Sequence, residues 1–343
     1  MTDDSAPKEE NIPLSLEAHA RASKKTGSKV RFVIDNKDRT TLEKKVKDKT
    51  PFDLPELDTF LRYDDPHEFL TNLNQIDSGS TSNIYTAKYN DDYICVKEMP
   101  LTPENRATLI NETRIMSSTK SDNVVKFISA HLVNDSILYI LMELMNAGSL
   151  YTIASNCQEI INEGHIAYFA REILKGLNDI HSKNRIHRDI KTDNVLLNMD
   201  GEVKIADFGF SAQLDKKKKR ESIVGTPHWM APELIQGFPY SFPVDIWGVG
   251  VLCRELVECN PPYHYLPPMK AVYEIVTHGL PELKNKEKFS NDFLSFLDSC
   301  LQQDPAKRGT IPDLLKHPFL EKACGKEEIH QLIEAGYADN GDE

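Results

Sequence analysis

The chain has 343 residues, of which 40% are hydrophobic and 27% charged, and its formal net charge is −12. This acidic balance argues against a protein whose general surface binds nucleic acids or anionic membranes. No stretch approaches the roughly 18 consecutive apolar residues of a transmembrane helix, and the acidic start "MTDDSAPKEE" is unlike a secretory signal. Six scattered cysteines without a C-x-x-C pair are typical of free thiols, so we expect a cytoplasmic protein, with the nucleus as the alternative.

Residues 1–65 differ from the rest of the chain in composition. They are rich in lysine, aspartate, threonine and serine and poor in large apolar residues. We interpret them as a basic, mostly disordered N-terminal extension, because such a composition buries too little apolar surface to fold alone. The alternative is a regulatory arm that docks on an acidic surface or an anionic membrane, in which "KVRFVI" forms one strand.

The pattern changes at about residue 70. Four short β-rich runs, "NIYTAKY", "YICVKEM", "VVKFISA" and "ILYILMEL", follow one another up to residue 145, with one helix expected near 103–117. After residue 146 helical periodicity dominates, most clearly in "HIAYFAREILKGLNDIHS". A small sheet lobe joined to a larger helical lobe predicts a cleft between them, which is a favoured place for a ligand.

Two motifs in the second half carry the chemistry. In "IHRDIKTDNVLL", Asp189 can accept the proton of a hydroxyl group, Lys191 can neutralise phosphoryl charge and Asn194 can hold a magnesium ion. In "ADFGF", Asp207 supplies the carboxylate oxygen that Mg²⁺ prefers. Both motifs in this order, followed by "APE" at 231–233, indicate phosphoryl transfer rather than an ordinary surface loop.

A lysine and a glutamate upstream fit the same chemistry. Lys97 ends the apolar strand run in "YICVKEM", where it can hold the α- and β-phosphates of a nucleotide, and Glu112 in "LINETRIM" can pair with it. Each also has an ordinary interpretation, as an exposed strand-end lysine and a solvated helix glutamate.

With these motifs in place, residues 70–320 resemble a eukaryotic protein kinase domain, and more closely the PAK-like, sterile-twenty branch of serine/threonine kinases. "MELMNAGSL", "DFGFSAQL", "VGTPHWMAPELI", "VDIWGVGVL" and "DPAKRGTIPDLLKHPFL" carry the closer match. The resemblance implies an α+β, bilobal kinase fold with ATP and Mg²⁺ as cofactors. We expect a five-stranded antiparallel sheet plus one helix over 70–145, a mainly helical lobe over 146–320 and a tail helix within 321–343.

The resemblance also implies roles for single residues. Lys97, Glu112, Asp189 and Lys191 would be catalytic, and Asn194 and Asp207 would hold the metal. Asp245 would tie down the catalytic loop, while Glu233 and Arg308 would form a buried ion pair. Residues matching the family's ATP-binding positions are Ile76, Gly79, Ser80, Ile84, Cys95, Lys97, Met142, Glu143, Met145 and Leu196.

The glycine-rich loop departs from the family pattern Gly-x-Gly-x-x-Gly. Its three positions read Asp77, Gly79 and Ser82. Side-chain strain and charge repulsion there predict an ATP affinity about 10- to 100-fold weaker than that of an intact loop. We therefore expect an active kinase with an unusual loop, and keep a pseudokinase scaffold as the alternative. A P-loop or dinucleotide-binding protein is excluded because its motifs are missing.

Regulation and substrate choice follow from the same resemblance. Ser222 aligns with the activating phosphosite, whose phosphate can pair with Arg188, and Lys191 and Thr226 fit a serine/threonine kinase. Asp193 and Glu255 match acidic positions that receive basic residues before the phosphosite of a protein substrate. The small-GTPase-binding motif of many PAK relatives is missing, so activation by a GTPase is doubtful.

Overall fold

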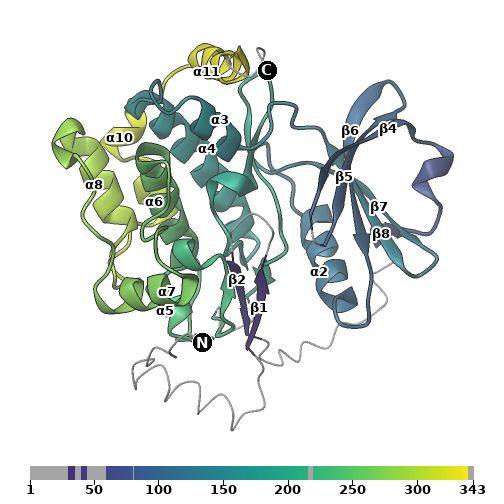
Figure 1. Ribbon diagram of the computed structural model, residues 1–343, viewed down its shortest axis with the longest axis horizontal. Coiled ribbons are helices and arrows are strands. Elements are labelled where there is room, and N and C mark those ends of the chain that lie inside the picture. Colours follow the sequence, from purple (N-terminus) through teal and green to yellow (C-terminus); the bar gives the residue numbers. More distant parts are fainter. Residues whose placement is uncertain (1–29, 35–39, 45–58, 80, 215–218, 339–343) are drawn as a thin grey trace, which may run out of the picture.

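The computed structural model describes residues 30–34, 40–44, 59–79, 81–214 and 219–338. Figure 1 shows a lobe built on a β-sheet beside a larger lobe built from helices, with the chain passing from the first to the second after β8. This arrangement agrees with the predicted bilobal α+β fold. Among the described residues, no helix is both long and apolar enough to cross a membrane.

The small lobe holds a six-stranded sheet of spatial order β3-β7-β8-β6-β5-β4. Its strands are β3 (Leu61–Arg62), β4 (Thr71–Ser78), β5 (Asn83–Tyr89), β6 (Asp92–Pro100), β7 (Phe127–Val133) and β8 (Ile137–Glu143). The prediction of five antiparallel strands is confirmed for β4 to β8. The sixth strand, β3, pairs parallel to β7 and lies in the stretch assigned to the extension. Leu61 explains this difference, because its side chain is buried against the sheet and draws the segment into the lobe.

One helix, α2 (Arg106–Ser117), packs on this sheet, where the sequence predicts one. Ile115 and Met116 are buried and face the apolar core. Glu112 lies on the same helix and is only 5% exposed, so the helix brings a carboxylate towards the interior rather than to solvent. A buried carboxylate requires a charged or hydrogen-bonding partner, and this partner belongs to the site described below.

The large lobe contains the remaining α-helices of the described residues. They are α3 (Leu150–Asn156), α4 (Glu163–Ser182), α5 (Pro232–Ile235), α6 (Pro243–Glu258), α7 (Pro268–Thr277), α8 (Asn291–Cys300), α9 (Ile311–Leu314), α10 (Pro318–Glu321) and α11 (Lys326–Ala338). The apolar face predicted for "HIAYFAREILKGLNDIHS" is the buried face of α4, which begins at a capping box formed by Asn162 and His165. Large aromatic side chains, among them Trp247 and Phe169, fill the core of this lobe.

Short strands in the large lobe present the functional loops. β9 (Arg185–Ile186) pairs with β12 (Ala212–Gln213), and β10 (Val195–Leu197) pairs with β11 (Val203–Ile205). These two small antiparallel pairs enclose the "HRD" and "DFG" motifs at the side of the lobe that faces the sheet. Single helical turns, η3 (Thr192–Asn194) and η4 (Pro227–Trp229), follow the motif loops.

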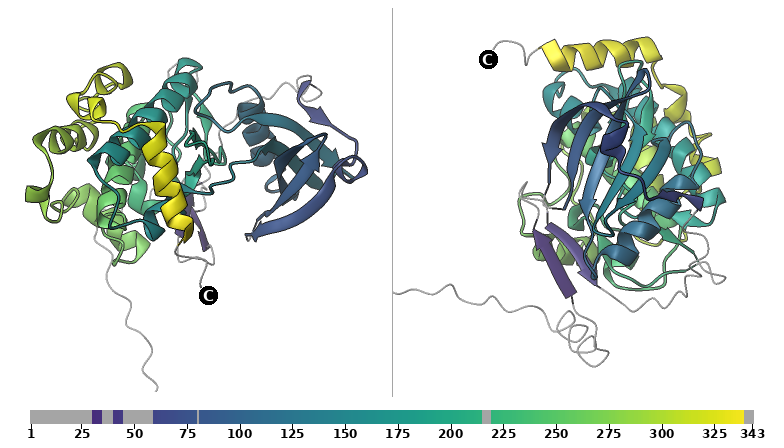
Figure 2. Two further views of the ribbon diagram at one scale, coloured as in Figure 1. Left: turned by 90° about the horizontal axis from the view of Figure 1, so that it is seen from above. Right: turned by 90° about the vertical axis from the view of Figure 1, so that its right-hand side faces the viewer.

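Part of the N-terminal extension forms a hairpin. β1 (Val30–Ile34) pairs antiparallel with β2 (Thr40–Lys44), and β2 pairs in turn with β13 (Val224–Gly225) of the large lobe. Figures 1 and 2 show this purple hairpin against the large lobe. The strand that the alternative interpretation expects in "KVRFVI" is therefore present as β1, while a mostly disordered extension stays a prediction. The other residues of the extension before Thr59 lie outside the described residues.

The last helix, α11, lies across the large lobe (Figure 2). The Asn156 amide donates to the Gly336 carbonyl oxygen at 2.9 Å, and the Cys157 thiol donates to the Leu332 carbonyl oxygen at 3.3 Å. Leu332 itself is buried, as are the apolar residues on either side of it along the helix. This packing joins the tail to α3, near the point where the two lobes meet.

Candidate active site

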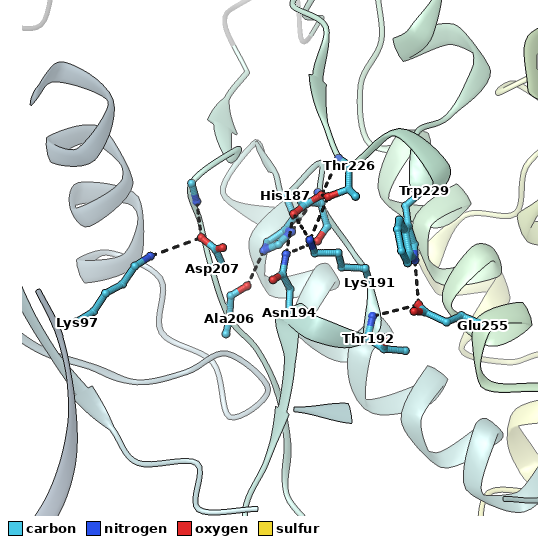
Figure 3. A network of polar contacts seen from close by, with 12 residues as sticks. Lys97, His187, Lys191, Thr192, Asn194, Ala206, Asp207, Thr226, Trp229 and Glu255 are labelled. Atoms are coloured by element: carbon cyan, nitrogen blue, oxygen red, sulfur yellow. Dashed lines mark hydrogen bonds and ion pairs between the residues drawn. The ribbon is translucent and has the colours of Figure 1, made fainter. Parts of the chain in front are cut away.

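The Asp189 carboxylate lies at the centre of a polar network with Asn194, Lys191 and Thr226. Figure 3 shows these three partners close together. Asp189 Oδ2 accepts from the Asn194 amide at 2.8 Å, and its Oδ1 accepts from the Thr226 hydroxyl at 2.7 Å and the Thr226 backbone N–H at 3.0 Å. Lys191 Nζ donates to the Thr226 hydroxyl at 3.1 Å and lies 3.6 Å from Asp189 Oδ2. The structure therefore brings Asp189, Lys191 and Thr226 together and places a carboxylate beside a lysine.

Asp245, on α6, fixes the backbone of the catalytic loop. Its carboxylate accepts from the backbone N–H groups of His187 at 2.9 Å and Arg188 at 2.7 Å, and from His181 Nε2 at 2.8 Å. Burial opposes the charge of Asp245, but these donors outweigh it and hold the pKa of the carboxyl below its ordinary value. Arg188 has a φ of 70°, a left-handed conformation that costs about 1–2 kcal/mol and that these bonds maintain.

Lys97 connects the two lobes. Its Nζ lies 3.2 Å from Glu112 Oε1 on α2. It also lies 3.8 Å from Asp207 Oδ1, as Figure 3 shows. Burial alone would lower the pKa of Lys97, but the two carboxylates raise it above its ordinary value. Lys97 in turn lowers the pKa of Asp207, whereas burial raises the pKa of Glu112 above its ordinary value. The ordinary interpretations of Lys97 and Glu112, as solvated surface residues, are wrong.

Asn194 and Asp207 present oxygen atoms that fit Mg²⁺. The Asn194 amide nitrogen is engaged by Asp189, so the amide oxygen is the atom that could bind a metal ion. Asp207 Oδ1 accepts from the Gly209 N–H at 3.1 Å, and the side chain is 47% exposed. No cluster of three acidic, histidine or cysteine residues within the described ranges could hold a metal alone. Two protein oxygens with nucleotide phosphates are the arrangement that Mg²⁺ usually takes.

Strand register brings the predicted adenine-binding residues towards the junction of the lobes. Cys95 lies opposite Met142, and Ile84 lies opposite Lys97, while Leu196 comes from β10 of the large lobe. Met142 and Met145 are buried at the back of the site, whereas Ile76 on β4 is 56% exposed. Burial raises the pKa of the Cys95 thiol to about 11, so this cysteine is present as the neutral thiol.

The hinge has a polar anchor that sequence reasoning missed. Glu143 was expected to bind adenine, and its side chain accepts from Lys204 Nζ at 2.7 Å and from the Lys126 N–H at 2.6 Å. Both parts of Glu143 therefore fix the hinge, because its backbone N–H also donates to the Lys126 carbonyl oxygen at 3.0 Å. Lys204 lies 61 positions further along the chain, so no local pattern signals this pair.

The glycine-rich loop is a tight turn at the end of β4. The Gly79 N–H donates to the Ser82 carbonyl oxygen at 2.8 Å, and Asp77 Oδ1 accepts from the Ser78 N–H at 2.9 Å. Neither Asp77 nor Ser82 is among the residues with positive φ. The strain considered from the sequence is therefore absent, and only the charge of Asp77 remains unfavourable for phosphate. Ser80 lies outside the described residues.

The activation segment places Ser222 beside the catalytic loop. Arg188 Nη1 donates to the Ser222 hydroxyl at 2.9 Å, and the Tyr240 hydroxyl donates to the Ser222 carbonyl oxygen at 2.7 Å. Ser222 is only 9% exposed. Gly225 follows with a φ of 128°, and an added Cβ would lie 2.8 Å from the Arg188 carbonyl oxygen. Only glycine fits here, which explains the "VGT" sequence before Thr226.

A buried ion pair holds the end of this segment. Arg308 donates two parallel hydrogen bonds to Glu233, at 2.6 and 2.7 Å, and its guanidinium lies over the Trp247 ring. Such bidentate pairs are among the strongest side-chain hydrogen bonds. The predicted pairing of Glu233 with Arg308 is thus present in the structure.

The two predicted substrate-recognition residues differ in their surroundings. Asp193 is half-buried beside the catalytic loop. Glu255 is only 2% exposed, and its Oε2 accepts from the Trp229 indole N–H at 2.9 Å and lies 3.4 Å from the Thr192 N (Figure 3). Glu255 therefore has a structural function of its own, and contact with a substrate stays a prediction.

Comparison with known proteins agrees with this geometry. Residues 70–320 match the family described as the protein kinase domain. The chain is 41% identical over 283 residues to the serine/threonine-protein kinase pakA of Dictyostelium discoideum, covering 81% of this chain and 24% of the relative. It is 42% identical to pakC of the same organism over 276 residues, covering 79% of this chain and 58% of pakC.

A fungal relative extends the comparison. The serine/threonine-protein kinase ste20 of Aspergillus oryzae is 41% identical over 275 residues, which is 79% of this chain and 32% of that protein. This chain thus spans between about a quarter and three fifths of the length of these three relatives. The family match and the assembled HRD and DFG sites point the same way, and the chain belongs to the protein kinase family, on its PAK-like, sterile-twenty branch.

Proposed function

We propose that this chain is a protein serine/threonine kinase that transfers the γ-phosphoryl group of ATP to hydroxyl groups of protein substrates. The observation that carries the proposal is the Asp189 network, in which one carboxylate is oriented by Asn194 and Thr226 and faces Lys191 at 3.6 Å. Phosphoryl transfer depends mainly on such positioning and on charge stabilisation rather than on covalent chemistry.

Each residue has a defined task in this mechanism. Asp189 accepts the proton of the substrate hydroxyl, and Lys191 stabilises negative charge that develops on the phosphoryl group. Lys97, held by Glu112, binds the α- and β-phosphates. Asn194 and Asp207 would hold Mg²⁺, which supplies further charge neutralisation when bound.

Regulation is proposed to run through Ser222. Arg188 already contacts its hydroxyl, so a phosphate of roughly −2 charge there would form a charge-assisted pair and fix the segment. Lys219 and Arg220 precede Ser222, and we propose autophosphorylation in trans at this serine, with basic residues preferred before the phosphosite. Asp193 is the better placed acceptor for such residues because Glu255 is buried.

The test is the intact mass of the purified chain after incubation with MgATP, beside an Asp207→Ala variant. We expect added phosphate on the wild type alone, and peptide mapping to place it on Ser222. A wild type that gains no phosphate and shows no stabilisation by MgATP in a thermal titration would overturn the proposal and favour the pseudokinase alternative. Stabilisation without phosphate would retain ATP binding and refute self-activation.

A further inference from the structure

The C-terminal end of α2 lies among cationic side chains from the large lobe. Ser118 directly follows the last residue of α2, and its hydroxyl donates to the Arg114 carbonyl oxygen at 2.6 Å. The same hydroxyl oxygen accepts from Arg185 Nη2 at 2.8 Å. Lys183 Nζ donates to the Ser118 carbonyl oxygen at 2.8 Å. One serine hydroxyl is therefore in contact with a guanidinium and close to an ammonium group.

Around Arg185 and Lys183, the neighbouring side chains carry more positive than negative charge. Burial lowers the pKa of Arg185, and the neighbouring Arg114 lowers it further. Burial also lowers the pKa of Lys183, with Arg185 and Lys120 adding to the effect, while Asp179 is the carboxylate that opposes it. Cations that destabilise one another form a site that an anion would relieve, in a chain whose net charge is −12.

Space and exposure allow a larger group at this position. Ser118 is exposed and begins a stretch without helix or strand that continues to Lys126. A surface cavity of about 360 Å³ opens beside it, lined by Ser117, Ser118, Ser129 and Arg62 among others. A phosphoryl group on the hydroxyl can therefore extend into solvent-accessible space without displacing the core.

We propose that Ser118 is a phosphorylation site whose phosphate is held by Arg185 and Lys183. In the reaction, the Ser118 hydroxyl oxygen forms a bond to the γ-phosphorus of ATP. The bond from that phosphorus to the bridging oxygen breaks, ADP leaves, and the hydroxyl proton passes to the catalytic aspartate of a protein kinase. The product carries roughly two negative charges and three strong acceptor oxygens.

The helix end opposes this modification, but the cations outweigh it. A helix C-terminus carries about half a negative elementary charge, which repels phosphate. Two full positive charges lie within hydrogen-bonding distance of Ser118, and Lys120 follows two positions later. The balance is attractive, so the phosphate would bind the end of α2 to β9 rather than unfold the helix.

A phosphate on Ser118 would act on the junction between α2 and the large lobe. Arg185 also donates to the Ile115 carbonyl oxygen at 3.1 Å and to the Thr119 hydroxyl at 2.9 Å, so it already joins α2 to the large lobe. Glu112 lies six positions before Ser118 and pairs with Lys97. A phosphate on Ser118 would strengthen the junction on which the placement of Glu112 depends.

The first test measures the phosphate environment and does not require the chain to be active. Full-length protein with genetically encoded phosphoserine at position 118 is compared with protein carrying it at 117. Ser117 is the matched control, because its hydroxyl also donates to the Arg114 carbonyl oxygen, at 3.0 Å. Within the described ranges, no hydrogen bond joins Ser117 to Arg185 or Lys183.

We expect the phosphorus NMR signal at 118 to titrate below the about 6 that is usual for a phosphoserine, and below the control. Lys183→Gln combined with Lys120→Gln should move this titration upwards. The melting temperature of the 118 form should exceed that of unmodified protein by about 2 °C or more. A titration equal to the control, or a lower melting temperature, would overturn the proposed site.

The second test asks whether the modification occurs. Phosphopeptides are mapped from the chain purified from its own cells, and from recombinant wild type and Asp207→Ala after incubation with MgATP. Phosphate on Ser118 in the recombinant wild type alone assigns the reaction to this kinase. Phosphate only in the cellular protein assigns it to another kinase. Its absence from every sample refutes modification at Ser118.

Discussion

The unusual glycine-rich loop yields a quantitative prediction about nucleotide affinity. Asp77→Asn removes one negative charge while the new side-chain oxygen can still accept from the Ser78 N–H, as Asp77 does at 2.9 Å. Asp77 is exposed, so its charge acts through water. A negative charge about 4 Å from a phosphate oxygen then weakens the binding of ATP by on the order of 1 kcal/mol, and salt reduces this repulsion further. We expect the KM for MgATP to fall by about fivefold at low ionic strength.

The backbone of the loop supplies the control. Because Asp77 has no positive φ, Asp77→Gly relieves no strain and should resemble Asp77→Asn to within about twofold. Ser82→Gly should bring no gain for the same reason. The assay is the KM for MgATP at two salt concentrations, with the difference between variants and wild type shrinking at the higher one. An unchanged KM in Asp77→Asn together with a tenfold fall in Asp77→Gly would refute the electrostatic reasoning.

Four further predictions follow from other parts of the structure. Glu233→Gln leaves the buried charge of Arg308 without its carboxylate and should lower the free energy of unfolding by about 3–5 kcal/mol in urea titrations, whereas a loss below about 1 kcal/mol would contradict the buried pair. The pKa of Asp245 is lowered in the folded protein, so the charged carboxylate stabilises the fold above its ordinary pKa of 3.8. This stabilisation is lost as the pH falls through the lower pKa that the carboxyl has in the folded protein. The difference in stability between wild type and Asp245→Asn should therefore be large at neutral pH and shrink in acid, and a difference that grows in acid would reverse this sign. With a pKa of about 11, only about one Cys95 thiol in a thousand is ionised at pH 8, so iodoacetamide should label it more than a hundredfold more slowly than a free cysteine peptide, and an equal rate would show an open thiol. Removing residues 1–58 deletes the hairpin that pairs with β13 next to Thr226, which donates to Asp189, and should raise kcat/KM for a peptide substrate, while an unchanged value would mean that the hairpin leaves the substrate site open.

The candidate catalytic residues could be predicted because the proposed chemistry fixes both residue type and spacing. Asp189 and Asn194 are five positions apart, so one loop brings them together whatever surrounds it. Lys97 and Glu112 needed one further assumption, a strand followed by a helix, which the sequence pattern also supplied. The two lobes could be predicted because the sequence pattern changes from mainly strand-like to mainly helical at one place, near residue 146.

The contacts that sequence reasoning missed join residues distant in the chain. Lys204 meets Glu143 across 61 positions, and Tyr240 meets Ser222 across 18. Neither pair has a spacing that any regular element dictates. The same holds for β3 and for the pairing of β2 with β13, since strand partners depend on the whole fold rather than on the strand's own residues.

Glu255 and Asp77 show that resemblance to a family predicts where a side chain lies in the fold better than it predicts the burial and the partners of that side chain. Both were assigned by alignment, one as favourable for a basic substrate and the other as harmful to ATP binding. The Glu255 carboxylate is enclosed and receives the Trp229 indole, so its charge has a local partner. Asp77 lies in solvent with ordinary backbone geometry, so its effect is limited to a screened charge. The free energy that either residue contributes depends on burial and on partners, and these are decided by distant segments that pack around it.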